Sequence, residues 1–182
     1  MQSESMFNKL VKWVVVIALV YMVYTMFFAG SGEKIDLANY VDATADGLAV
    51  SLGVDLPDNP DMVSKIHQYS DSKIKVRGNG HVGVVYFDGK QTGLFCDTRS
   101  YSFFNVKLGD YMTSVEANMT YEYDDVFYVI NEYGGMSTTY FYYNKANNDC
   151  FAIIYNTQQD KVAAMTYYND YRKISENLSV IN

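Results

Sequence analysis

The sequence predicts an α+β protein in which an N-terminal transmembrane helix precedes two tandem units, each of short helices packed on an antiparallel β-sheet. Three observations lead to this prediction. The 17-residue run Trp13–Ala29 contains no charge, proline or glycine. The second half of the chain holds four strand-like segments separated by turns. The first half repeats part of this order at an offset of 67 to 69 residues.

The N-terminal run would reach about 25 Å as a helix, the short end of what spans a bilayer. Lys9 and Lys12 precede it, and after it acidic residues outnumber basic residues by eight. The positive-inside rule therefore predicts a single-pass signal-anchor over residues 13–29, with a cytoplasmic N-terminus and an extracytoplasmic main domain.

A secretory signal peptide is the alternative interpretation of this run. Ala29-Gly-Ser31 has the small residues of a cleavage site, and cutting near Ser31 would release a secreted protein. In either case the same domain boundaries are expected. They are a cytoplasmic segment 1–12, the anchor or signal peptide 13–29, a short linker 30–36, a first repeat 37–104, a second repeat 105–172 and a tail 173–182.

The second repeat shows its elements more clearly. Thr113-Ser-Val-Glu116 matches a capping box, and Val115 and Met119 share one face of the short helix that would follow. Residues rich in β-branched and aromatic side chains then predict strands over Val126–Tyr133, Thr138–Asn144, Cys150–Asn156 and Lys161–Tyr168. Short turns separate these segments, as in an antiparallel meander.

The first repeat follows the same order less distinctly. Leu48 and Leu52 mark a short helix over residues 46–53, and the prolines of Pro57-Asp-Asn-Pro60 indicate a loop after it. Strands are expected over Lys73–Arg77, Gly83–Tyr86 and Gly93–Cys96. Because one unit of about 70 residues buries little surface, the two units are expected to share a core.

In the second half of the chain, a predicted helix follows Val106-Lys-Leu-Gly-Asp110, and strands then lead to Lys161–Tyr167. This order of elements resembles the repeat of the β-lactamase-inhibitor-protein-like superfamily (BLIP-like). SmpA-type outer-membrane assembly lipoproteins share this repeat, and anchored extracellular proteins of Gram-positive bacteria carry it in tandem. The resemblance covers about residues 36–170 and implies a bacterial cell-surface protein that binds other proteins. This chain departs from it in its tyrosine content and blurred first repeat, and no inhibitory contact residue can be transferred.

Tyrosines mark the candidate binding face. Alternate residues of a strand share a face, so Tyr140 and Tyr142 point one way, and Phe141 and Tyr143 the other. One face must be core, and the other suits contact with a protein or stacking on a glycan. The residues proposed for this face are Tyr140, Tyr142, Tyr155 and Tyr167. The alternative is that helices cover one face and wetted tyrosine hydroxyls line the other.

Other candidate sites are weaker. Cys96 and Cys150 permit a disulfide in an exported domain, and the alternative is two unpaired cysteines, with Cys96 as a small buried hydrophobe. His67 and His81 stand in different predicted elements and adjoin no nucleophile motif. The acidic loop containing Asp55 lacks the glycine and terminal glutamate of an EF-hand. The sequence therefore predicts no catalytic residue, no cofactor and no metal site.

Charge and composition limit the function further. A hydrophobic fraction of 49% excludes a disordered chain, and a net charge of −7 without basic clusters argues against nucleic-acid binding. We therefore expect a membrane-anchored extracytoplasmic protein-binding or scaffolding module with no catalytic activity, whose partner is another envelope or extracellular protein. The alternatives are a structural subunit of a cell-envelope membrane assembly and a small surface hydrolase. The oligomeric state stays open.

Overall fold

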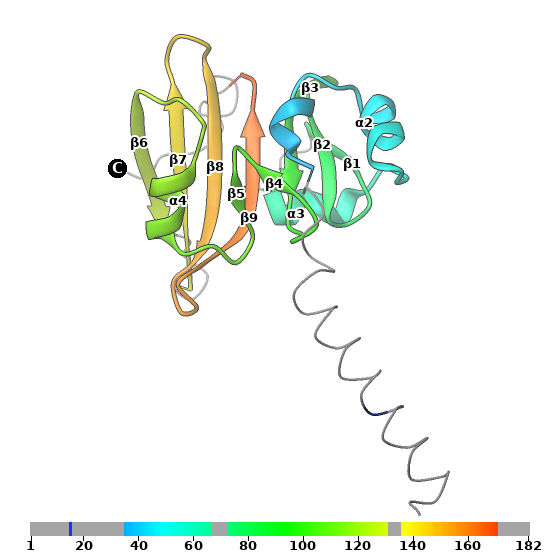
Figure 1. The fold of residues 1–182 in the computed structure, drawn as a ribbon. Coiled ribbons are helices and arrows are strands. Elements are labelled where there is room, and N and C mark those ends of the chain that lie inside the picture. Colours follow the sequence, from blue (N-terminus) through cyan, green and yellow to red (C-terminus); the bar gives the residue numbers. More distant parts are fainter. Residues whose placement is uncertain (1–14, 16–34, 67–72, 131–135, 171–182) are drawn as a thin grey trace, which may run out of the picture. The chain divides into compact units, whose positions relative to one another are not determined.

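The computed structural model describes Val15 and residues 35–66, 73–130 and 136–170 (Figure 1). All of them except Val15 belong to one compact unit, Ile35–Asn182. Its helices are η1 (Leu37–Tyr40), α2 (Ala45–Leu52), η2 (Pro60–Met62), α3 (Val63–Ile66) and α4 (Met112–Asn118). Its strands are β1 (Ile74–Gly78), β2 (Val82–Phe87), β3 (Lys90–Cys96), β4 (Ser102–Phe103), β5 (Val106–Lys107), β6 (Asp125–Ile130), β7 (Ser137–Asn144), β8 (Asp149–Asn156) and β9 (Lys161–Tyr168).

Seven strands form a single antiparallel sheet in the order β1-β2-β3-β9-β8-β7-β6. The hairpin β4–β5 forms a separate two-stranded sheet. Two meanders, β1 to β3 and β6 to β9, are therefore joined through their last strands. Strands β1 and β6 lie at the two ends of the sheet (Figure 1).

The predicted fold class is wrong in its architecture. The described part of the chain is mainly antiparallel sheet with short helices, rather than two helix-covered units behind a transmembrane helix. Pairing of β3 with β9 removes the edge that each meander would otherwise expose, and it produces one continuous sheet. Whether residues 37–104 and 105–172 are repeats stays a prediction.

Two apolar cores lie on opposite faces of this sheet. On one face, Leu48 of α2, Phe103 of β4 and Val115 of α4 pack with sheet residues that include Leu94 and Phe151. On the other face, η2 and α3 contribute side chains to a smaller core with β1, β2, β3, β7, β8 and β9. The sheet is thus covered on both sides over its central strands, and we refer to the face under α2 and α4 as the helix face.

The junction between the meanders is short and closely packed. Strand β3 pairs with β9 only from Gly93↔Tyr168 to Cys96↔Met165. A Cβ atom added to Gly93 would lie 2.3 Å from the carbonyl oxygen of Tyr167. Glycine is therefore required where the two halves of the sheet meet, because a larger residue would separate the backbones.

Asp36 attaches the N-terminal end of the unit to the β4–β5 hairpin. Its carboxylate accepts hydrogen bonds from the backbone amides of Ala38 at 2.9 Å, Phe104 at 3.0 Å and Asn105 at 2.9 Å. Phe104 and Asn105 both have positive φ, as a tight hairpin turn of the mirror-image type requires. The same carboxylate thus caps η1 and stabilises the turn.

The local predictions succeeded better than the architecture. The described parts of the predicted strands coincide with β1 to β3 and β6 to β9, and the helix expected over 46–53 is α2. The capping box at Thr113 is wrong, because α4 begins at Met112 with Tyr111 as its N-cap and no side-chain capping hydrogen bond. Instead, Thr44 caps α2 by accepting from the Gly47 amide at 3.2 Å.

The predicted single-pass anchor and its membrane localisation are also corrected. Among the described residues, no helix has the length and apolar character needed to cross a membrane. The longest of them, α2, has eight residues, whereas a bilayer requires about 20. Apart from Val15, the run 13–29 and the alternative cleavage site near Ser31 lie outside the described residues.

Candidate protein-binding surface

Strand β6 ends the sheet and exposes apolar side chains. Tyr128 is 63% exposed and Ile130 is 61% exposed, and Val126 and Val129 are exposed as well. Within the described part of the chain, β6 pairs with β7 on one side only. Proteins usually protect such an edge with charges, proline or a bulge, because it can pair with another chain. After Asp125, β6 contains no charged residue and no proline, and its pairing with β7 shows no bulge.

Hydrogen-bond alternation shows which residues of β6 face the open edge. The amide of Thr157 donates to the carbonyl of Met136 at 3.0 Å, so the backbone groups of Met136, just before β7, face β8. Backbone groups of alternate residues point to the same side of a strand, so those of the even-numbered β7 residues also face β8. Odd-numbered β7 residues therefore face β6, in agreement with donation from the Asp124 amide to the Tyr143 carbonyl at 2.8 Å. Given the register of β6 with β7, the residues whose backbone groups face outward are Val126, Tyr128 and Ile130.

A row of tyrosines extends from this edge across the helix face. The ring centroids of Tyr128 and Tyr140 are 6.0 Å apart, and those of Tyr140 and Tyr155 are 6.2 Å apart. Tyr140 and Tyr155 are half-buried. The three rings come from β6, β7 and β8, and we call them the tyrosine row. Such rings combine apolar area with a polar tip, which suits a protein interface.

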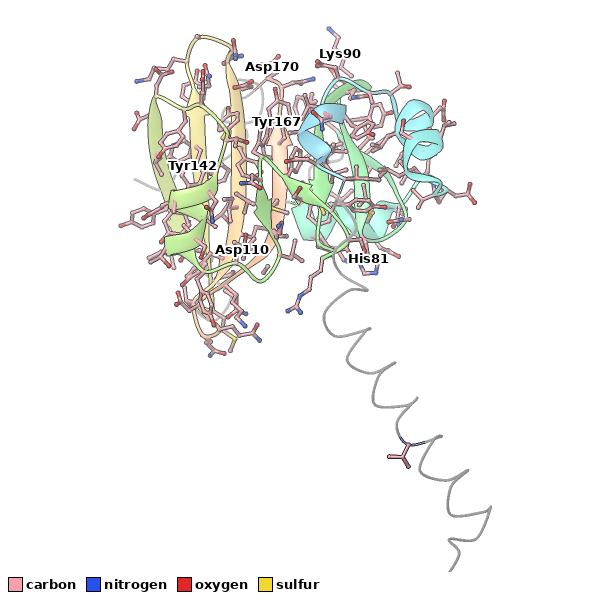
Figure 2. All side chains as sticks on the ribbon, viewed as in Figure 1. His81, Lys90, Asp110, Tyr142, Tyr167 and Asp170 are labelled. Atoms are coloured by element: carbon pink, nitrogen blue, oxygen red, sulfur yellow. The ribbon has the colours of Figure 1, made fainter. Side chains whose placement is uncertain are left out.

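Of the four tyrosines predicted from the sequence, the structure brings two into this row. Tyr142 is only 3% exposed, and its ring centroid lies 5.0 Å from that of Tyr123. Burial, followed by the Glu116 carboxylate, raises the pKa of Tyr142 to about 12. Tyr167 belongs to β9 and is 7% exposed (Figure 2). The prediction is therefore wrong for Tyr142 and Tyr167, whose rings belong to the core.

Sequence reasoning missed Val126, Tyr128 and Ile130 as site residues. A signal for them existed, because Val126-Phe-Tyr-Val-Ile130 is an uncharged run at the start of the predicted meander. The first strand of a meander can become an edge strand, whose outer backbone groups are unpaired. The run predicts a strand but not its place at the edge, since periodicity alone does not distinguish an edge strand from a central strand.

Carboxylates gather where β6 begins. Glu122, Asp124 and Asp125 are all exposed. The backbone amide of Lys145 donates to Asp124 at 2.7 Å, and its ammonium nitrogen lies 3.8 Å from an oxygen of Asp125. This end of the edge strand therefore carries three exposed carboxylates, of which Asp125 lies near an ammonium group, so it is acidic.

Asp149 is a buried carboxylate on the helix face. It accepts hydrogen bonds from the hydroxyls of Tyr121 at 2.5 Å and Tyr167 at 2.9 Å. Both tyrosine pKa values are raised, first by burial and then by the hydrogen bond to this carboxylate. The Tyr121 ring also packs with Phe104 and Phe151, and the Tyr167 ring packs with Phe104. This arrangement explains how a buried charge is tolerated, and it leaves Asp149 to a structural role.

A second polar cluster lies at the surface near the β1–β2 turn. His81 Nδ1 lies 2.8 Å from Asp97 Oδ1, and Lys65 Nζ donates to Asp97 Oδ2 at 2.8 Å. Lys65 also donates to the Gly80 carbonyl at 2.7 Å. An oriented histidine needs a nucleophile beside it to act in hydrolysis. No serine, threonine or cysteine among the described residues is hydrogen-bonded to His81, and His67 lies outside them.

The two cysteines are free and buried, so the structure contains no bond between them. Cys96 belongs to the core of the helix face, whereas Cys150 belongs to the core of the opposite face. Burial raises the pKa of Cys96 to about 11 and that of Cys150 still further. Neither thiol has the environment of a nucleophile, which requires a lowered pKa. Among the described residues, no three His, Cys, Asp or Glu side chains are arranged to hold a metal ion, and the acidic loop at Asp55 is included.

Comparison with known proteins adds little to this description. The sequence matches no protein-family model and no curated protein. A crystal structure of an extracellular protein containing an SCP domain, from Bacillus anthracis str. Ames, is similar with a TM-score of 0.48 and 7% identity. The match covers 81% of this chain and 50% of that chain, so this chain spans about half the length of its neighbour. The BLIP-like resemblance stays a prediction.

Proposed function

We propose that this chain is a protein-binding module without catalytic activity, and that β6 with the tyrosine row is its contact surface. The observation that carries the proposal is the exposure of Val126, Tyr128 and Ile130 on a strand with one open edge. Exposed apolar residues that adjoin one another mark interaction sites, because solvation of such a patch is unfavourable.

The composition of the surface supports a protein as the ligand. Apolar and aromatic residues occupy its centre, and the carboxylates Glu122, Asp124 and Asp125 lie at its border. Protein interfaces commonly combine an aromatic centre with a polar rim. The clustered carboxylates argue against a nucleic acid, whose phosphates would be repelled.

A photo-crosslinking amino acid at position 128 of the full chain tests this proposal in the cells that produce it. Val50 on α2, which is 84% exposed and lies outside the tyrosine row, provides the matched control position. Irradiation should give a discrete protein adduct from position 128 and none of that mass from position 50. An equal adduct pattern from both positions, or no adduct from position 128, would contradict the proposal.

A further inference from the structure

We propose that the partner contributes an extended segment that pairs with β6 as an eighth strand of the sheet. This inference rests on the proposed function and adds to it the mode of binding. Val126, Tyr128 and Ile130 direct their backbone N–H and C=O groups away from β7, as the hydrogen-bond alternation showed. A chain placed along this edge would satisfy these groups and cover the exposed side chains at the same time.

The pairing direction follows from the sheet. All pairings within the seven-stranded sheet are antiparallel, and antiparallel pairs are slightly more stable per residue than parallel ones. In an antiparallel arrangement, the partner residues meet Ile130, Tyr128 and Val126 in that order from N- to C-terminus. Directly opposed side chains share a face, so these three partner residues extend the tyrosine row and should be apolar or aromatic.

Charge complementarity identifies the C-terminal end of the partner segment. After the residue opposite Val126, an antiparallel partner reaches Asp125 and then Asp124, beside the exposed carboxylate of Glu122. Lys or Arg at these partner positions would balance the excess of negative charge. The predicted segment therefore has three apolar residues at alternate positions, followed by basic residues.

The same charge argument disfavours a second copy of this chain as the occupant. Strand β6 has the sequence Asp-Val-Phe-Tyr-Val-Ile and contains no basic residue to place against Asp124 and Asp125. The chain also carries a net charge of −7, so two copies repel one another. We therefore assign the edge to a different protein with a basic, apolar-alternating segment.

The test uses the full chain and the blocked synthetic peptide Val-Thr-Val-Thr-Val-Lys-Lys, with binding measured by fluorescence anisotropy of a labelled N-terminus. Its valines would lie opposite Ile130, Tyr128 and Val126 and would direct their amides toward β6. N-methylation of the three valines should weaken binding at least tenfold. N-methylation of the two threonines, whose amides point away from β6, is the matched control and should change affinity less than threefold.

Charge reversal tests the orientation. Asp125→Lys should weaken binding of the Lys-Lys peptide several-fold and strengthen binding of a Glu-Glu counterpart. No saturable binding of the parent peptide, or equal weakening by both N-methylated forms, would overturn strand addition. The proposed function would survive that result if the adduct at position 128 persists. A full chain that sediments as a dimer, and as a monomer after Tyr128→Lys, would overturn the inference in favour of a second copy.

Discussion

Tyr121 donates its hydroxyl hydrogen bond to Asp149 at a distance of 2.5 Å, inside the apolar core of the helix face. Tyr167 donates to the other oxygen of the same carboxylate at 2.9 Å. The loop before β6, the start of β8 and the end of β9 are therefore connected through one buried charge. Because charge-assisted hydrogen bonds are stronger than neutral ones, this carboxylate helps to fix the strands that support the tyrosine row.

Replacement of Asp149 by alanine should lower the free energy of unfolding by about 2–4 kcal/mol, because two buried hydroxyls lose a charged acceptor. Urea denaturation of the full chain, followed by circular dichroism, measures this change. The matched control is Asp55→Ala, which removes an exposed carboxylate and should change stability by less than about 0.5 kcal/mol. Equal effects of the two substitutions would contradict a stabilising role for the Asp149 network.

Stability should fall in alkaline solution, and the buried tyrosines determine the sign. In the folded protein the pKa values of Tyr121 and Tyr167 are raised, first by burial and then by the Asp149 carboxylate. Above about pH 10 the unfolded chain releases these protons while the folded protein retains them. The unfolded state then binds fewer protons, so the free energy of unfolding decreases as pH rises.

Each such tyrosine contributes a slope of about −1.4 kcal/mol per pH unit once the unfolded chain is ionised. Urea denaturation at several pH values between 9 and about 11.5 measures the total slope for the full chain. Tyr121→Phe should make the slope shallower by about one tyrosine's contribution. An unchanged slope in this variant would mean that Tyr121 ionises equally in both states.

The strands could be predicted from the sequence, whereas their assembly could not. Segments such as Thr138–Asn144 are recognisable as strands because they contain β-branched and aromatic residues and are bounded by turns. The pairing of β3 with β9 depends instead on contacts between residues about 70 positions apart, for which the sequence has no local signal. One clue was available in Gly93, because glycine inside a strand often marks a close approach of two backbones.

The same distinction applies to the binding surface. Strand periodicity places Tyr140 and Tyr142 on one face of β7, and in the structure Tyr155 of β8 lies beside Tyr140 on that face. Periodicity does not show which part of a face other elements cover, so it does not separate the buried Tyr142 from the half-buried Tyr140. The carboxylate of Asp149 and the neighbouring core rings enclose Tyr167, so its exposure depended on tertiary structure.

Gly93→Ala should destabilise the junction of the two meanders. The added methyl would lie 2.3 Å from the Tyr167 carbonyl oxygen and 3.1 Å from the Tyr168 ring, so β3 and β9 must separate. We expect a loss of about 1–3 kcal/mol or more in the free energy of unfolding, as for other overpacked sites. Gly47→Ala in α2 is the matched control, because its Cβ would meet only the Thr44 hydroxyl at 3.3 Å and alanine favours helix. Denaturation midpoints that fall equally in both variants would contradict the close packing at Gly93.

Cys96 and Cys150 should react slowly with thiol reagents in the native protein. Burial raises the pKa of Cys96 from 9.0 to about 11, which lowers its reactive thiolate fraction by roughly 100-fold at neutral pH. Cys150 is buried in the opposite core and has a pKa raised by the same cause. Mass spectrometry after iodoacetamide treatment should therefore show no early modification of the native chain and two modifications in denaturant. Val50→Cys supplies an exposed thiol on α2 that should be modified early in the same sample. Failure to modify either native cysteine in denaturant, without prior reduction, would reveal a bond between them and would contradict their placement in separate cores.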